Sequence, residues 1–386
     1  MRILALVSDR SVPPVTGPKV RNRHLWRALE RQGAEVRILG TDLSRSDAAP
    51  AEPGEFFPPE REVLPLRAWN ALNHSYHEWP VSRRLASRVR ELAAEWRPDV
   101  VHAEELRMSA YLPPRPAGGG CPILSVTLHN VETDVMRLAG STSFRIGRRL
   151  IERHHLRSLI RFERERLAAV DVAFAYSPAD LARHRRIHPD VRWALTRNGA
   201  DAAGVRPAPQ PAAPSVLLVG SLSYAPNVRG LAWFLDEILP LLGTGITVTV
   251  AGSGAGTSVR ARLAATAVRF ADEPTDLAPL YAEHAVCAVP VLEGSGTRGK
   301  ILEALAHGRA VVSTRLGAGG LDLADGEGIS LADDPADFAA TVRHLAQHPA
   351  EREALARRGR EAVLARYDWS VAAGELLEEW NRCASR

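Results

Sequence analysis

The alternation of short apolar runs with longer amphipathic stretches constrains the fold of this chain more than any other feature. Runs rich in Val, Ile and Leu recur from the first residues onward and are separated by stretches with helical spacing. This is the pattern of βα units that build a parallel sheet. In the N-terminal half it predicts strands at 3–8, 36–40, 63–66, 100–103, 123–128, 172–176 and 192–196.

A proline-rich stretch interrupts this pattern once. Residues 204–214, GVRPAPQPAAP, hold four prolines, which are excluded from helix interiors and central strands, so we expect a stiff linker. A second series of strands is predicted at 216–220, 246–251, 268–271, 286–291, 310–314 and 328–331, and a helical tail at 336–380.

The two series predict two Rossmann-like α/β domains whose parallel sheets face each other across a cleft, where open sheets of this kind bind ligands. The expected divisions are an N-terminal domain over 1–203, the linker over 204–214, a C-terminal domain over 215–365, and a final helix over 366–386 that could cross back to the first domain. A length of 386 residues agrees with two domains of ordinary size.

Composition excludes several classes of protein. No apolar run is long enough to span a bilayer, and charges at Asp9 and Arg10 come too early for a signal peptide, so we expect a cytoplasmic protein. The three cysteines show neither disulfide nor zinc spacing. A net charge of +4, without a concentrated basic tract, does not indicate nucleic-acid binding.

The segment 290–314, PVLEGSGTRGKILEALAHGRAVVST, predicts a phosphate site. A strand ends near residue 291, a Gly-Ser-Gly-Thr turn follows, and a helix begins near Thr297. Such a helix start offers free N–H groups and a positive dipole end to an anion. Arg298 and Lys300 add two cations, and Lys300 is one of only two lysines among 49 basic residues, the other being Lys19. The combination suits a diphosphate, whose charge grows as a glycosidic bond breaks.

This segment resembles the donor-site signature of the retaining glycosyltransferases of family 4, in the branch written GSGTRxKxLEAxAxGxxVVST. The resemblance implies the GT-B fold, diphosphate contacts from Arg298 and Lys300, and ribose contacts from Glu303. The wider family has a second glutamate where this chain has Ser295. Its sugar contacts could come from the backbone of the turn or from the nearby Glu293. The predicted donor-binding turn is Gly294, Ser295, Gly296 and Thr297.

The segment 220–230, GSLSYAPNVRG, is similar to the GSxxxxPN element of the same branch. The resemblance adds Ser221, Asn227 and Arg229 to the predicted donor-binding residues. For Arg229, a phosphate contact and a solvated arginine at a helix start are equally compatible with the sequence.

Two elements of the N-terminal half resemble the acceptor side of the family. The loop SDRSVPPVTGPKVRNR is similar to PPxxGGxxR, which places Gly17 at the close backbone approach to a sugar and adds it to the predicted donor-binding residues. In the same loop, Lys19 and Arg21 are candidate acceptor-side residues. The sequence LHNVE, directly after the strand at 123–128, is similar to HNxE. Its Asn130 and Glu132 join the acceptor-side candidates.

His129 of that element is the predicted catalytic residue of the first domain. A histidine at the carboxyl end of a parallel strand can point into the ligand crevice and contact a sugar hydroxyl. The alternative is a histidine that only stabilises the strand end. With Arg298 and Lys300, it completes the predicted catalytic set.

The predicted function is a retaining transfer from a UDP- or GDP-type sugar to a hydroxyl of a small-molecule, glycan or lipid-linked acceptor. No DxD motif is present, so no metal and no cofactor are expected. An epimerase or hydrolase of the same fold, and an inactive nucleotide-sugar-binding protein, are the alternatives. The arginine-rich stretch 145–166 could make a weak peripheral membrane contact or simply form a solvated helix face.

Overall fold

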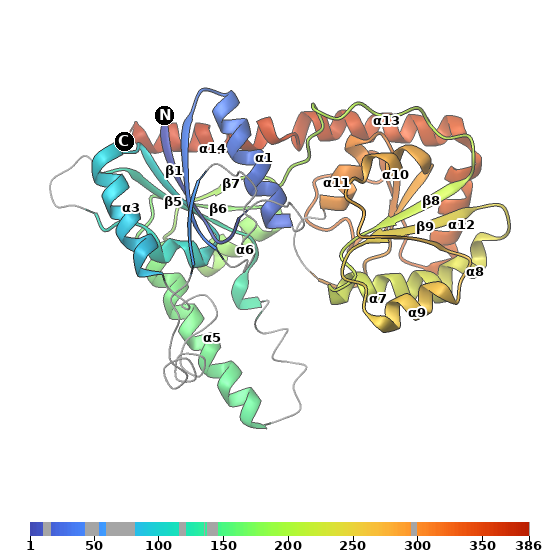
Figure 1. Ribbon diagram of the computed structural model, residues 1–386, viewed down its shortest axis with the longest axis horizontal. Helices are drawn as coiled ribbons and strands as arrows, with labels where there is room; N and C mark the ends of the chain where they lie inside the picture. Colours follow the sequence, from blue (N-terminus) through green and yellow to red (C-terminus); the bar gives the residue numbers. More distant parts are fainter. Residues whose placement is uncertain are drawn as a thin grey trace. The chain divides into compact units, whose positions relative to one another are not determined.

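The computed structural model of the chain describes residues 1–10, 17–42, 54–58, 82–115, 121–134, 136, 146–294 and 299–385. These residues form two compact α/β units (Figure 1). The first comprises Met1–Arg197 and Ala372–Arg386, and the second comprises Asn198–Val371.

The first unit contains a seven-stranded sheet in the order β3-β2-β1-β4-β5-β6-β7, with every pairing parallel. The central order is that of a Rossmann fold, as predicted. Strand β3 was not predicted, and the strand expected at 63–66 lies outside the described residues. The strands are β1 (Arg2–Val7), β2 (Glu35–Thr41), β3 (Glu55–Phe57), β4 (Val100–Glu104), β5 (Ile123–Leu128), β6 (Val172–Ala175) and β7 (Trp193–Leu195).

Helices accompany this sheet, and two of them start at serines that cap them. Ser82 accepts a hydrogen bond from the N–H of Leu85, and Ser177 accepts one from the N–H of Asp180, which satisfies donors that a helix start leaves unpaired. The helices are α1 (Gly17–Arg31), α3 (Arg83–Trp96), the 3₁₀ helix η1 (Leu106–Tyr111), α5 (Ile146–Leu167), α6 (Pro178–Ile187) and most of α14 (Trp369–Ala384).

The second unit repeats the architecture with six parallel strands in the order β10-β9-β8-β11-β12-β13. Alternate residues of β8 enter different cores, since Val216 and Leu218 join one apolar cluster and Leu217 the other. Both faces of the sheet are therefore covered, which explains its continuous apolar runs. The strands are β8 (Ser215–Val219), β9 (Thr247–Gly252), β10 (Arg269–Asp272), β11 (Val286–Val289), β12 (Ala310–Ser313) and β13 (Ile329–Leu331).

The helices of the second unit include the predicted tail, which is divided where prolines start new helices. They are α7 (Ala225–Trp233), the π-helical turn η2 (Phe234–Ile238), α8 (Leu239–Leu242), α9 (Thr257–Ala264), α10 (Ala278–Glu283), α11 (Gly299–Ala306), α12 (Pro335–Gln347) and α13 (Pro349–Arg366). Among the described helices of both units, none is long and apolar enough to cross a membrane.

Buried arginines hold the proline-rich stretch 204–214 against the second unit. Arg309 donates to the carbonyls of Ala208 and Pro209, and Arg352 donates to that of Pro211. Both side chains are fully buried. The carbonyls of Ala208, Pro209 and Pro211 thus accept from arginine side chains of the second unit. The stretch belongs to that unit, and the division between the two units falls before it, between residues 197 and 198.

Helix α14 returns to the first unit after the second is complete. Trp380 is fully buried there, and its indole N–H donates to the hydroxyl of Ser125 on β5 at 3.0 Å. Arg192 and Arg197 pair with Glu379 and Glu375 of the same helix. The C-terminal residues are thus part of the first unit's core.

A buried histidine makes the stability of the first unit sensitive to acid. His184 is fully buried, stacks on Trp193 at 4.4 Å between ring centroids, and has no hydrogen-bond partner on either ring nitrogen among the described residues. Burial lowers its pKa, although Glu163 nearby acts in the opposite direction. The folded state therefore favours the neutral ring.

We predict that His184→Phe flattens the loss of stability between pH 7 and pH 5. The unfolded histidine takes up a proton below about pH 6.5 while the folded one resists it, so stability falls as pH falls, by up to about 1.4 kcal/mol per pH unit. Urea unfolding across this range measures the slope. His154→Phe, at an exposed position of α5, is the matched control and should keep the wild-type slope. An unchanged slope in His184→Phe would assign the acid sensitivity elsewhere.

Candidate functional site

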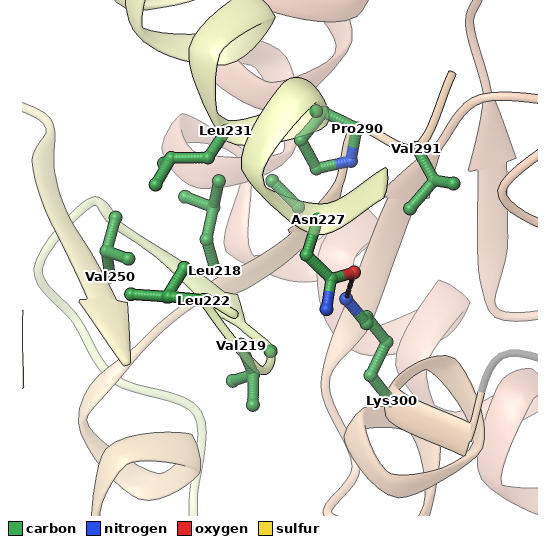
Figure 2. Close-up of a pocket in the computed structure, with 12 residues that line it drawn as sticks. Leu218, Val219, Leu222, Asn227, Leu231, Val250, Pro290, Val291 and Lys300 are labelled. Atoms are coloured by element: carbon green, nitrogen blue, oxygen red, sulfur yellow. Dashed lines mark hydrogen bonds between the residues drawn. The ribbon is translucent and has the colours of Figure 1, made fainter. Parts of the chain in front are cut away.

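A pocket opens in the second unit where the central strands β8 and β11 end. Strand β8 lies between β9 and β11, so this is the point of the sheet where strand order reverses and ligands usually bind. Most of its lining is apolar, and its polar side chains are Asn227 and Lys300 (Figure 2). The lining residues are Leu218, Val219, Gly220, Leu222, Asn227, Gly230, Leu231, Val250, Ala288, Pro290, Val291 and Lys300.

The ammonium group of Lys300 is held in this pocket by Asn227. Lys300 Nζ donates to Asn227 Oδ1 at 2.8 Å, and Asn227 Nδ2 donates to the carbonyl of Ser221 at 2.9 Å. A Cβ at Gly220 would lie 2.8 Å from Lys300 Nζ and 2.9 Å from Asn227 Nδ2. A side chain at 220 would therefore displace the ends of both side chains, and glycine lets the cation rest against the end of β8.

The backbone around this cation also depends on a second glycine. A Cβ on Gly230 would lie 2.2 Å from the carbonyl oxygen of Pro290, so α7 can pack against the end of β11 only without a side chain there. Helix α7, which follows β8, and the segment that follows β11 are thereby brought together at the pocket.

Glu303, the predicted ribose ligand, lies one helical turn after Lys300 on α11. Burial raises its pKa, and a hydrogen bond from the Tyr281 hydroxyl to Oε2, at 3.2 Å, acts against that rise. Tyr281 in turn stacks on His307 at 4.6 Å between centroids. Tyr281 therefore fixes the orientation of the carboxylate, a role that the sequence did not reveal.

Several other predicted donor residues can now be placed. Arg229 pairs with Glu293 and is 63% exposed, so a protein carboxylate accepts from its guanidinium in this structure. The Ser221 hydroxyl lies 2.9 Å from that of Ser223. Gly294 has φ 100°, a conformation that favours glycine. The predicted residues Ser295, Gly296, Thr297 and Arg298 lie outside the described residues.

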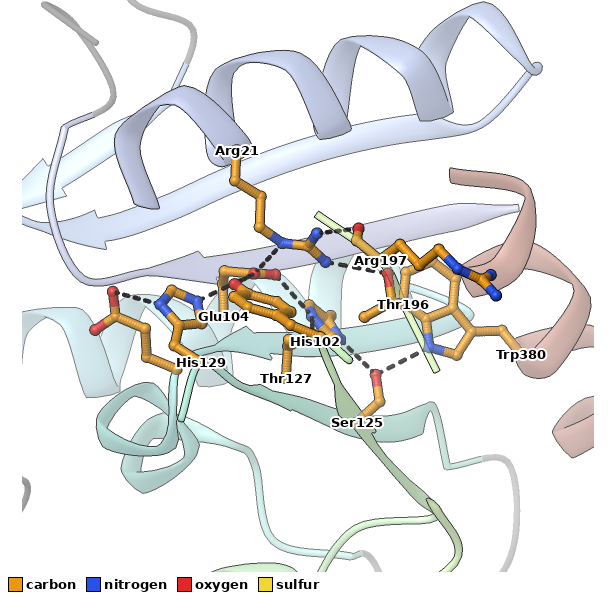
Figure 3. Close-up of polar contacts among 11 residues, drawn as sticks. Arg21, His102, Glu104, Ser125, Thr127, His129, Thr196, Arg197 and Trp380 are labelled. Atoms are coloured by element: carbon orange, nitrogen blue, oxygen red, sulfur yellow. Dashed lines mark hydrogen bonds and ion pairs between the residues drawn. The ribbon is translucent and has the colours of Figure 1, made fainter. Parts of the chain in front are cut away.

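The first unit contains a buried polar network centred on Glu104, the last residue of β4 (Figure 3). Its side chain is fully buried and accepts four hydrogen bonds. Oε1 accepts from Arg21 Nε at 2.7 Å, the Tyr176 hydroxyl at 2.9 Å and His129 Nε2 at 3.3 Å, while Oε2 accepts from His102 Nε2 at 3.1 Å.

These donors decide the charge of Glu104. Burial alone would raise its pKa, but the Arg21 charge and the hydrogen bonds from His102 and His129 hold the pKa well below its usual range. Burial also lowers the pKa of His102. The network therefore contains an ionised carboxylate, a guanidinium and a neutral imidazole, with its charges paired.

The ionised carboxylate fixes the tautomer of His129. A carboxylate only accepts, so His129 Nε2 carries the proton that is donated to Glu104. The ring packs against Tyr176 at 4.7 Å between centroids, and the side chain is 11% exposed. The remaining nitrogen, Nδ1, lies 3.7 Å from Glu105 Oε1. His129 therefore has one protein-bound nitrogen and one on its outer side.

The network continues inward to the C-terminal helix. Trp380 donates to Ser125 Oγ, and that hydroxyl can then donate to His102 Nδ1 at 2.8 Å, since His102 Nε2 is itself the donor to Glu104. Thr127 Oγ1 lies 3.0 Å from the same Nε2. A chain of hydrogen bonds thus connects α14 with the histidine at the end of β5.

The predicted acceptor-side residues have different environments. Arg21 is fully buried, and its described polar partners are Glu104, Thr196 and the carbonyl of Arg197, so it positions the network from inside. Because Arg21 is buried and its guanidinium donates to these protein groups, it is not placed as an arginine that contacts a ligand directly. Lys19 pairs with Asp9 at 3.0 Å.

Gly17, a predicted donor-binding residue, and the two remaining acceptor-side candidates, Asn130 and Glu132, also lie within the described residues. Gly17 begins α1, and a Cβ there would meet no atom of the described residues within 4 Å. Asn130 and Glu132 are partly buried beside His129 in the chain. Their contacts with an acceptor stay a prediction.

Sequence reasoning did not find His102, Glu104, Tyr176 or Trp380. A signal existed in the strand VVHAE, where two ionisable side chains at alternate positions point to one face of a strand that is otherwise apolar. Buried ionisable groups need partners, so this spacing could have identified a polar network. Among the described residues, no group of three or more His, Cys, Asp or Glu side chains could hold a metal ion.

We predict that the Arg21–Glu104 pair is strongly coupled. Glu104→Gln or Arg21→Met alone should cost about 3–5 kcal/mol, because each leaves a buried charge without its partner. The double variant should cost clearly less than the sum of the two single variants. Denaturant unfolding of all four proteins measures the coupling.

The exposed pair Arg88–Glu55 supplies the control for this cycle. It also joins a guanidinium to a carboxylate with two hydrogen bonds, but its side chains are 29% and 49% exposed. Glu55→Gln should therefore change stability by about 1 kcal/mol or less. Additive costs at Arg21 and Glu104 would contradict the coupling.

Comparison with known proteins identifies the chain's relatives. A model of "Glycosyltransferase Family 4" matches residues 15–203, and one of "Glycosyl transferases group 1" matches residues 213–348. Glycogen synthase from Mycobacterium tuberculosis is 29% identical, over 97% of this chain and 92% of that protein. An uncharacterised 44.6 kDa protein from Klebsiella pneumoniae is 26% identical, but the match spans only 45% of its length and 43% of this chain.

Solved structures share the fold. Sucrose-phosphate synthase from Thermosynechococcus elongatus has a TM-score of 0.73 at 17% identity, with all of both chains covered. HepE from Anabaena, in complex with UDP and glucose, has a TM-score of 0.67 at 15% identity, with 99% of each chain covered. The predicted family and fold class are thereby confirmed: the chain belongs to the family 4 glycosyltransferases and has the GT-B fold.

Proposed function

We propose that this glycosyltransferase transfers a sugar from a nucleoside-diphosphate sugar, of UDP or GDP type, to an acceptor hydroxyl with retention of configuration and without a metal. The observation that carries the proposal is the Lys300 ammonium group, which Asn227 holds against Gly220 at the end of β8. A cation at the switch point of a parallel sheet is suited to a diphosphate.

The diphosphate would be bound by positive charges that are fixed in position. Lys300 is the second residue of α11, so the positive end of the helix dipole adds to its charge. Arg298, which precedes the described part of α11, is proposed as the second cation. Because such donors are already in position, they stabilise the charge that develops on the leaving phosphate and do not have to reorganise during the reaction.

The nucleoside would be bound on the far side of this cation. Glu303 follows Lys300 on the next turn of α11, and the Tyr281 hydroxyl orients its carboxylate. Carboxylate oxygens accept hydrogen bonds, and the two hydroxyls of a ribose are matching donors. The complex of HepE with UDP supports a uridine nucleotide as the first donor to test.

The sugar is assigned to His129. Because Glu104 holds Nε2, the ring is fixed in orientation and Nδ1 remains available for a sugar hydroxyl. In the proposed reaction the bond between the anomeric carbon and the diphosphate oxygen breaks, and the acceptor oxygen bonds to that carbon on the same face. The acceptor proton passes to the departing diphosphate oxygen.

The acceptor is proposed as a small molecule, a glycan or a lipid-linked sugar. Helix α5 is relevant to the acceptor because four arginines at helical spacing, Arg153, Arg157, Arg161 and Arg164, are exposed on it. Its other exposed side chains, among those that the structure describes, are Ile151, His154 and Glu165. A basic face of this kind fits a weak peripheral contact with anionic lipid, which would suit a lipid-linked acceptor.

We predict that nucleoside diphosphate binding depends on Lys300 and persists in EDTA. Thermal stabilisation by UDP, GDP and dTDP and their sugars identifies the donor, since a ligand that binds only the native state raises its melting temperature. Lys300→Ala should lower turnover about a hundredfold or more. Lys19→Ala, which removes the other lysine, is the control and should lose much less. Equal turnover of Lys300→Ala and wild type, or a strict requirement for Mg²⁺ or Mn²⁺, would refute this assignment.

We predict that His129→Ala loses most turnover but keeps its affinity for the nucleoside diphosphate. Its interactions with the sugar strengthen in the transition state, whereas nucleotide affinity comes from the second unit. Calorimetric titration and a turnover assay on the same preparation test the two halves. Wild-type turnover would make His129 a structural residue, and release of free sugar independent of added acceptor would indicate a hydrolase.

A further inference from the structure

Glu105 has a backbone conformation that is nearly restricted to glycine. It directly follows β4 and has φ 91° and ψ 145°. A side chain in this region is strained. The other described non-glycine residues with positive φ, Arg97 at 49° and Glu273 at 47°, have the φ of the ordinary left-handed region. Glycine would relieve the strain at position 105, yet the chain has glutamate there.

Local structure does not account for this glutamate. Glu105 precedes the 3₁₀ helix η1, but its side chain makes no capping hydrogen bond. Its backbone N–H donates to the carbonyl of Thr127 at 3.0 Å, which any residue except proline could do. The side chain therefore has no role in the turn itself.

The carboxylate of Glu105 lies on the outer side of His129. Its Oε1 is 3.7 Å from His129 Nδ1, and its side chain is 22% exposed, whereas Glu104 is completely buried. Since Glu104 holds Nε2, His129 directs Nδ1 toward Glu105. The separation is too long for a hydrogen bond, but ligand oxygens can lie within hydrogen-bond distance of both groups.

We propose that Glu105 is a substrate-binding residue whose carboxylate, together with His129 Nδ1, binds neighbouring hydroxyl groups of a sugar. Nδ1 is the ring nitrogen that Glu104 does not hold, so the carboxylate and the imidazole lie side by side and can together bind two adjacent hydroxyls. The inference rests on the proposed function, because it assigns a further residue to the same site. The strained backbone is what aims the carboxylate at this position.

The charge of Glu105 is tested with Glu105→Gln, which keeps the size and the backbone of the glutamate. UDP-glucose, with glucose supplied as the acceptor, is the probe for turnover, and UDP alone is the probe for nucleotide affinity. We expect UDP release from UDP-glucose to fall at least about tenfold, while the Kd for UDP changes less than twofold. Arg97→Gly, at a positive-φ position before β4 begins, is the control and should keep wild-type turnover.

The strain is tested with Glu105→Gly and Glu105→Ala. Both lack the carboxylate, but only glycine relaxes the backbone, so Glu105→Gly should melt at least about 2 °C above Glu105→Ala. Both should lose turnover. Higher stability with lower activity is the signature of a residue retained for its ligand.

A third measurement does not need a nucleotide. Glucose is titrated into the wild type and into Glu105→Gln, and the ring resonances of His129 are followed by NMR. We expect a shift in the wild type that Glu105→Gln lacks. Retained UDP release with a lost glucose shift assigns the hydroxyls to the acceptor, whereas loss of both assigns them to the donor sugar.

The outcomes separate this inference from the proposed function. A wild type that neither binds UDP, GDP or dTDP nor cleaves UDP-glucose refutes the proposed function, and the glucose titration still decides the role of Glu105. Wild-type UDP release by Glu105→Gln together with an unaltered glucose titration overturns the role of Glu105 while leaving the proposed function intact.

Discussion

The first unit depends on the ion pair between Arg21 and Glu104. A carboxylate in the middle of a sheet core is costly unless its charge and its lone pairs are matched, and here one guanidinium and three further donors match them. The same carboxylate accepts from His129, so the group that stabilises the core also orients the histidine that follows β5. The stability of this unit and the orientation of His129 therefore depend on the same buried carboxylate.

The second unit positions its cation in a different way. Lys300 donates to the amide oxygen of Asn227 and lies against a strand end that has no Cβ. The amide oxygen accepts from the ammonium group and orients it, but it carries no charge of its own. In the proposed function, a carboxylate orients the histidine assigned to the sugar, and an amide orients the lysine assigned to the diphosphate.

Much of this arrangement could be predicted from the sequence. The parallel sheets followed from apolar periodicity, and Gly220, Asn227, Lys300 and Glu303 lay in motifs whose glycines and charges have a local physical meaning. The spacing of His102 and Glu104 indicates buried polar groups on β4 but not their partners, because Arg21 lies 83 residues from Glu104 and Trp380 lies 255 residues from Ser125. Contacts at such separations leave no local pattern, and the backbone strain at Glu105 is visible only in dihedral angles.

The return of α14 to the first unit has a consequence for synthesis of the protein. Trp380, which fills the space beside Ser125 and His102, leaves the ribosome only after the entire second unit has been made. Until then the first sheet has a gap in its core and exposed polar groups that lack partners. Domains usually fold in the order of their synthesis, but here the first to emerge is the last to be completed. A growing chain that stalls within the second unit would therefore present an unfinished first unit to chaperones and proteases.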